Sequence, residues 1–234
     1  QTAHCGWQPC SLLPSAQRSG EATAMLTINY FIGMAATAAF AMSGVLAMTG
    51  KDMDIVGLTF MGVVTAIGGG TLRDLLLNVP VFWVLDFNFV WVAIAASLLA
   101  FVLERYLRAE GALTAILYLD AFGIALFGGQ ALDKSLLLEY SAPVAVVMAT
   151  LTAIGGGLIR DVLAKRENLL LSHELYVSTI IAGSLVYLVL LGISGKTLLT
   201  SIAGVGFTFA FRALAIYRHW QMPGWLRLRS HFNG

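Results

Sequence analysis

The sequence predicts an all-α integral membrane protein in which seven transmembrane helices form two inverted three-helix repeats plus a seventh helix. Hydrophobic residues make up 58% of the 234 residues, charged residues make up 12%, and the mean hydropathy is +0.81; soluble domains are about one quarter charged. Several apolar stretches reach the roughly 20 residues with which a helix spans about 30 Å of hydrocarbon. A ten-residue motif also occurs twice, which indicates a duplicated unit.

Loop charges and turn residues divide the apolar sequence into separate spans. No stretch alternates apolar and polar residues with the period of a strand, so helices rather than a barrel cross the bilayer. The predicted spans lie at about 28–49, 55–77, 86–106, 111–130, 140–163, 174–193 and 196–217.

The first 24 residues are polar and mixed, and they contain no apolar core of a signal peptide. We expect residues 1–24 to be disordered or a non-native extension, with the native chain starting near Met25. Residues 25–220 then form a single membrane domain, and residues 221–234 form a cytoplasmic tail. Cys5 and Cys10 have no other cysteine or histidine cluster beside them, and we interpret them as incidental.

Lysine and arginine residues collect on one side of the predicted spans, which indicates that this side is cytoplasmic. The N-terminus then lies outside and the C-terminus inside. Because the basic residues lie in loops and in the tail and form no stripe, a nucleic-acid partner is not expected. The residues on the basic side are Lys51, Arg105, Arg108, Lys165, Arg166, Arg218, Arg227 and Arg229.

The duplicated motif reads TAIGGGTLRD at residues 65–74 and TAIGGGLIRD at residues 152–161, an offset of 87 residues. At the same offset Phe40 maps to Phe127, and the third span maps to the sixth. Each unit holds three spans, so the second unit enters the membrane from the opposite side. Repeat one is predicted at about 28–106, repeat two at about 111–193 and the seventh helix at about 196–217.

Each motif places three consecutive glycines inside an apolar span. A glycine costs a helix about 1 kcal/mol relative to alanine, so we expect each triplet to kink or unwind its helix. The freed backbone groups would then be buried in protein or line a water-filled path. The alternative is that the glycines simply permit close helix packing. The predicted hinge residues are Gly68, Gly69, Gly70, Gly155, Gly156 and Gly157.

An arginine and an aspartate follow each triplet, still inside apolar sequence: Arg73 with Asp74, and Arg160 with Asp161. Ionisable groups at membrane depth are costly, so these side chains are expected to pair and to face the interior or water. Adjacent residues point in different directions on a helix, and the repeat suggests the cross pairs Arg73 with Asp161 and Arg160 with Asp74. The alternative is that both arginines reach the membrane surfaces as anchors.

Four further polar residues within the spans are candidate pore-lining groups. Asp120 is an isolated carboxylate early in the fourth span, where it either lines the path or caps or pairs near the interface. The hydroxyls of Ser43, Thr65 and Thr152 offer oxygens to a permeating ion, or they bond to their own helix backbone. Arg212 in the seventh span is interpreted as reaching the cytoplasmic surface.

The sequence contains no nucleophile with a base, no metal-ligand spacing and no phosphate-binding or dinucleotide loop. We therefore expect neither an enzyme nor a protein with a bound metal or cofactor.

Two three-span units that each carry AIGGG, two further residues and Arg-Asp resemble the bacterial branch of the trimeric intracellular cation (TRIC) channel family, whose domain is also named glycine transporter. The resemblance covers about residues 26–220. It implies a homotrimer with an hourglass pore in each protomer, lined by the first, second, fourth and fifth spans and bent at the glycine triplets. The two Arg-Asp pairs would lie near the constriction.

The same resemblance implies passive conduction of K⁺ and also Na⁺, as permeant ions rather than cofactors. The partners are other copies of the chain and membrane lipid, in the plasma membrane of a bacterium or archaeon. The sequence has neither a K⁺-channel filter nor a ring of acidic residues, so modest selectivity is expected. The alternative is a secondary transporter of glycine or another small amino acid, because inverted repeats with broken helices are also a transporter design.

Overall fold

The computed structural model describes residues 20–104, 106, 109–165, 177–194, 197–218 and 220, and these residues form eight α-helices. The predicted tail at 221–234 and residues 1–19 of the predicted extension lie outside the described residues. The helices are α1 (Gly20–Leu46), α2 (Ile55–Leu76), α3 (Phe82–Leu85), α4 (Asn88–Glu104), α5 (Ala109–Leu137), α6 (Ala142–Leu163), α7 (Val177–Ser194) and α8 (Thr197–Tyr217).

Seven of these helices correspond to the seven predicted spans, and the all-helical membrane fold is confirmed. Five are long and apolar enough to cross a membrane, namely α2, α5, α6, α8 and the Thr27–Leu46 part of α1, while α4 and α7 are shorter apolar helices. The single turn α3 was not predicted. It is attached to the end of α2, where the indole Nε1 of Trp83 donates to Thr71 Oγ1 at 3.0 Å.

The predicted end of the fourth span at residue 130 is wrong, because α5 continues to Leu137. The sequence LDKS at 132–135 was interpreted as a polar break, yet it is helical. Its charges are tolerated there because each has a partner on another helix: Asp133 accepts from Tyr187, and Lys134 pairs with Asp74.

The helices pack in pairs that follow the internal repeat. The first helices of the two units, α1 and α5, lie against each other, and so do the second helices, α2 and α6. At the centre of the core the repeat-related rings of Phe40 and Phe127 stack with centroids 5.6 Å apart. The pseudo-symmetry predicted from sequence therefore runs through the packed centre of the bundle.

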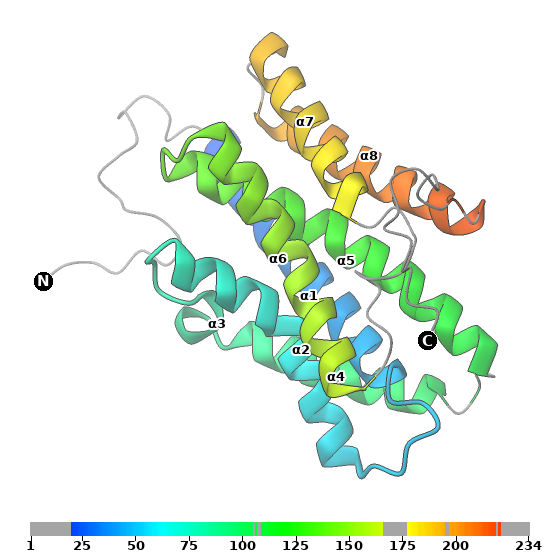
Figure 1. Cartoon of the computed structure of the whole chain (residues 1–234). Helices are drawn as coiled ribbons and strands as arrows, with labels where there is room; N and C mark the ends of the chain where they lie inside the picture. The colour runs from blue at the N-terminus through cyan, green and yellow to red at the C-terminus, as the bar shows by residue number, and fades with distance from the viewer. Residues whose placement is uncertain are drawn as a thin grey trace, which may run out of the picture.

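The last helix, α8, breaks this pseudo-symmetry. In the first unit α4 packs extensively on α1, whereas in the second unit its counterpart α7 packs mainly on α8, and α8 in turn packs on α5. Figure 1 shows α7 and α8 side by side at one edge of the bundle, with α2, α3 and α4 toward the opposite edge. The second unit consequently has an extra layer that the first unit lacks.

Candidate functional site

Helices α2 and α6 cross at the two glycine triplets with their backbones in contact. A Cβ added at Gly69 would lie 2.3 Å from the carbonyl oxygen of Thr152, and one added at Gly156 would lie 2.5 Å from that of Thr65. A Cβ at Gly155 would lie 3.1 Å from Gly69 Cα. Only glycine permits this approach, so the crossing supports the packing interpretation of these positions.

The unwinding that we expected at the triplets is not found. Both helices remain helical through their glycines, from Ile55 to Leu76 and from Ala142 to Leu163. The contact between the two backbones provides packing that offsets the low helix propensity of glycine. A hinge role for the triplets stays a prediction.

The three candidate hydroxyls lie fully buried beside this crossing. Each donates to a carbonyl of its own helix: Ser43 to Phe40 at 2.9 Å, Thr65 to Met61 at 2.7 Å and Thr152 to Met148 at 2.6 Å. These bonds agree with the backbone-bonding alternative. Ser43 Oγ also accepts a bond of 3.2 Å from Arg160, so it takes part in a charged group as well.

A first charged group, here named the Arg160 cluster, consists of Arg160, Asp161 and Asp120. Arg160 Nε lies 2.8 Å from Asp161 Oδ1, and its Nη1 lies 2.8 Å from Asp120 Oδ1 on α5. The guanidinium side chain is 0% exposed, and both aspartates are buried. The structure thus brings the isolated carboxylate of the fourth span to the arginine of the fifth.

A second group, the Arg73 cluster, consists of Arg73, Asp74 and Lys134. Arg73 Nε and Lys134 Nζ lie 2.7 and 2.8 Å from the same oxygen, Asp74 Oδ1. The other carboxylate oxygen accepts the backbone N–H of Phe82 at 2.9 Å. The Arg73 guanidinium also lies 5.8 Å from the centre of the Phe82 ring, within cation–π range.

The predicted cross pairs, Arg73 with Asp161 and Arg160 with Asp74, are wrong. Each arginine instead binds the aspartate that follows it, because its long side chain turns its Nε back toward the adjacent carboxylate. The anchor interpretation also fails, since neither side chain is more than 1% exposed. Arg212, which was expected to reach the surface, is likewise buried.

Sequence reasoning missed Lys134 as a member of this site. The repeat contained a usable signal: the first span was predicted to continue to residue 49, whose counterpart at the 87-residue offset is residue 136. Extending the fourth span to match would have placed Lys134 inside a helix, where a buried cation needs an acidic partner.

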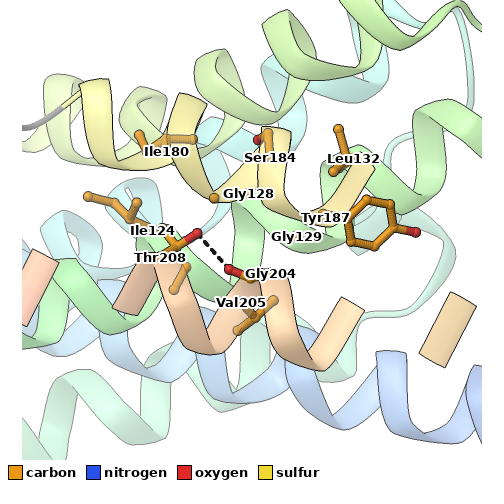
Figure 2. Close-up of a pocket in the computed structure, with 12 residues that line it drawn as sticks. Ile124, Gly128, Gly129, Leu132, Ile180, Ser184, Tyr187, Gly204, Val205 and Thr208 are labelled. Carbon is orange, nitrogen blue, oxygen red and sulfur yellow. Dashed lines mark hydrogen bonds between the residues drawn. The ribbon is translucent and has the colours of Figure 1, made fainter. Parts of the chain in front are cut away.

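A third polar group joins α5 to α7 and α8. Asp133 Oδ1 accepts from the Tyr187 hydroxyl at 2.5 Å, and Oδ2 accepts from the Ser201 hydroxyl at 2.9 Å. Next to it these helices line a partly open cavity of about 10 Å³, enough for about one water molecule. Figure 2 shows Tyr187 at one end of the cavity, Ile124 and Ile180 at the other, and the bond from Thr208 to the Gly204 carbonyl between them.

The two arginine clusters place buried charges on both sides of the glycine crossing. Paired charges of this kind inside apolar helices are costly to desolvate, and they typically face the bundle interior or a water-filled cavity.

Comparison with known proteins supports a membrane transport function. A family model described as "Glycine transporter" matches residues 30–105 and 117–191, two segments that begin 87 residues apart and reproduce the predicted repeats. The UPF0126 membrane protein of Vibrio cholerae is 38% identical over 199 residues, covering 84% of this chain and 82% of the relative. The UPF0126 inner membrane protein YadS of Escherichia coli K12 is 39% identical over 196 residues, covering 83% and 94%.

Two solved structures extend the comparison to the fold. The TRIC trimeric intracellular cation channel orthologue from Rhodobacter sphaeroides superposes with a TM-score of 0.78 at 28% identity, covering 83% of this chain and 100% of that one. A structure described in terms of conductance through TRIC cation channels superposes with a TM-score of 0.74 at 30% identity, covering 85% and 96%.

Proposed function

Because the chain belongs to the glycine transporter (UPF0126) family and has the fold of prokaryotic TRIC cation channels, we propose that it conducts monovalent cations passively across a bacterial inner membrane. The observation that carries this proposal is the match, at 28% identity, along the whole length of a solved TRIC channel chain. The proposed ions are K⁺ and also Na⁺. Selectivity between them is modest, because the sequence contains no TVGYG-type filter and no ring of acidic residues.

The proposed path runs through each protomer along α1, α2, α5 and α6. These helices carry both arginine clusters and the buried hydroxyls of Ser43, Thr65 and Thr152. At the crossing the backbones of Gly69 and Gly156 lie against the opposite helix. We propose that α2 and α6 bend at the glycine triplets and move apart to admit the ion.

We propose a homotrimer in a bacterial inner membrane. The solved protein from R. sphaeroides is named a trimeric channel, and the E. coli relative is named an inner membrane protein. The basic loops favour a cytoplasmic C-terminus. In that orientation the Arg160 cluster lies toward the cytoplasm, near the contact of Lys51 with the Ala164 carbonyl, and the Arg73 cluster lies toward the outside.

A carrier for glycine is the second candidate, because the matching family model has that description. In a carrier the guanidinium of Arg73 or Arg160 would hold the substrate carboxylate. A carrier must occlude glycine and saturate, whereas a channel passes ions along their gradient without a coupling ion.

The test uses the full chain in proteoliposomes with two tracers, labelled rubidium in place of K⁺ and labelled glycine. The channel proposal predicts rubidium uptake driven by a K⁺ gradient alone and no saturable glycine uptake. Saturable glycine uptake without rubidium flux would instead establish the carrier.

A matched pair of variants connects the flux to the crossing. Gly69→Val places a side chain against the Thr152 carbonyl, while Gly206 on α8 has open space around it. We expect Gly69→Val to abolish rubidium flux and Gly206→Val to leave it unchanged, with both proteins monodisperse after purification. Equal flux through both variants would exclude the crossing from the path.

A further inference from the structure

The two arginine clusters occupy equivalent places in the repeat but have opposite excess charge. In the Arg160 cluster one arginine lies between two carboxylates, whereas in the Arg73 cluster one carboxylate is shared by two cations. The 87-residue offset explains the difference: Asp120 has Gly33 as its counterpart, and Lys134 has Ala47. The first unit therefore has one carboxylate fewer, and an added cation comes to it from the second unit.

The missing carboxylate leaves a specific atom without a partner. In the second unit Arg160 Nη1 donates to Asp120 and to Ser43. The corresponding Arg73 Nη1 is buried and has no hydrogen-bond partner among the residues that the structure describes. The counterpart of Ser43 is Gln130, whose amide donates to the Asn29 carbonyl at 2.5 Å.

A buried guanidinium N–H that has no acceptor and lies beside excess positive charge is costly inside a membrane-spanning bundle. Arg73 is 1% exposed, whereas Lys134 on the same cluster is 16% exposed, so the cluster can be reached from the Lys134 side. We propose that a small monovalent anion, chloride or a small carboxylate such as formate, binds the Arg73 cluster between Arg73 Nη1 and Lys134 Nζ.

This site also has a consequence for conduction, which rests on the proposed channel function. The excess positive charge of the Arg73 cluster repels an approaching cation, and a bound anion neutralises it. Cation current through the protein then depends on the anion present even though the anion itself does not cross.

Binding is tested on the purified full chain without any transport. The unfolding midpoint is measured at constant potassium and ionic strength while the bulky sulfonate MES is replaced by chloride, by formate or by glycine. Chloride at about five times its Kd is expected to raise the midpoint by about 2–4 °C. Comparison of the midpoint shifts in chloride and in formate shows which of the two anions the site prefers.

Two lysine variants assign the effect to the site. Lys134→Gln removes the excess charge of the Arg73 cluster and is expected to abolish the chloride shift. Lys51→Gln is the same substitution near the Arg160 cluster, and it is expected to keep the shift. A crystal soaked in bromide should show an anomalous peak beside Arg73 Nη1. An equal shift in wild type and Lys134→Gln, no shift with chloride or formate, or a shift with glycine alone would each overturn the proposal.

The electrical arm is separate from the binding arm. Replacing chloride by MES at constant potassium is expected to lower the K⁺ current of the wild type by about two-fold or more and to leave that of Lys134→Gln unchanged. A protein that binds chloride but passes no current contradicts the channel and leaves the anion site established. A K⁺ current that is independent of the anion contradicts the proposed neutralisation.

Discussion

At the scale of single residues, the Arg160 guanidinium shows how this bundle tolerates a charge out of water. Its Nε and Nη1 lie 2.8 Å from two different carboxylates, and Nη1 also donates to Ser43. Charge-assisted bonds of this length are about twice as strong as neutral ones. Without the Asp120 charge, Arg160 keeps its pair with Asp161 but loses one charge-assisted bond to Nη1 in a medium of low dielectric constant.

We therefore predict that Asp120→Asn lowers the free energy of unfolding by roughly 1–3 kcal/mol. The change keeps the side-chain size and removes only the charge beside Arg160. The measurement is the detergent-solubilised unfolding midpoint, with Asp52→Asn at an exposed loop position as the control. Similar midpoints for the two variants would show that Asp120 does not stabilise the buried guanidinium.

The glycine crossing gives a second prediction at residue scale. Gly69→Ala puts a methyl group 2.3 Å from the Thr152 carbonyl, a backbone atom that a side-chain rotation cannot move. Overpacking of this kind costs about 1–3 kcal/mol. Gly206→Ala, on an exposed face of α8 with nothing within 4 Å, is expected to be neutral or stabilising by up to about 1 kcal/mol. Thermal unfolding of the two alanine variants checks the contrast.

At the scale of elements, Asp133 on α5 contacts both α7 and α8. Its carboxylate accepts one hydroxyl from each of these helices, from Tyr187 on α7 and Ser201 on α8. In the same region a Cβ added at Gly183 would lie 1.8 Å from Thr208 Oγ1, so α7 and α8 are in close contact with each other. The pair is fixed to α5 through this polar contact and through the close approach of Gly129 on α5 to Val205 on α8.

Tyr187→Phe removes one of these two donors and leaves the buried carboxylate less satisfied. We predict a loss of about 1–3 kcal/mol and faster amide hydrogen exchange in α7 and α8 than in α1 and α2. Tyr217→Phe near the end of α8 is the control, because that side chain is 72% exposed. Uniform exchange across all helices in Tyr187→Phe would contradict a local attachment.

The ends of the repeated helices α2 and α6 are also equivalent. Asn78 follows α2 with φ 53°, and its counterpart Lys165 follows α6 with φ 46°. This left-handed conformation favours glycine, and asparagine tolerates it better than lysine. We predict that Lys165→Gly stabilises the protein by about 0.5–1 kcal/mol and that Asn78→Gly stabilises it less, as measured by their unfolding midpoints. Destabilisation by Lys165→Gly would show that the lysine side chain has another role there.

At the scale of the whole molecule, the architecture was predictable from the sequence because the apolar segments are long and the glycine motif occurs twice. Apolar length identified seven helices, and the motif at the 87-residue offset divided six of them into two units. The one-turn helix α3 was missed because four residues carry no periodicity, and the last turns of α5 were missed because Asp133 and Lys134 resemble a loop when their partners are unknown.

Apart from Lys134, the members of the site were predicted from the sequence, whereas their geometry was not. Burial of the two Arg-Asp pairs and of Asp120 follows from the cost of charged groups in lipid, and the structure buries all five side chains. The pairing was not predictable, since it depends on rotamers: each arginine folds back on its neighbour, and Asp120 and Lys134 reach across from α5. Sequence periodicity contains no information on which of several nearby carboxylates a long side chain selects.

The measurement that tests the central claim most directly is the reversal potential of the purified protein in a planar bilayer under a KCl gradient. Passive conduction of cations predicts discrete currents that reverse near the equilibrium potential of K⁺ and move only modestly when Na⁺ replaces K⁺ on one side. Reversal near the chloride potential, or electrical silence from protein that takes up glycine in liposomes, would contradict the account.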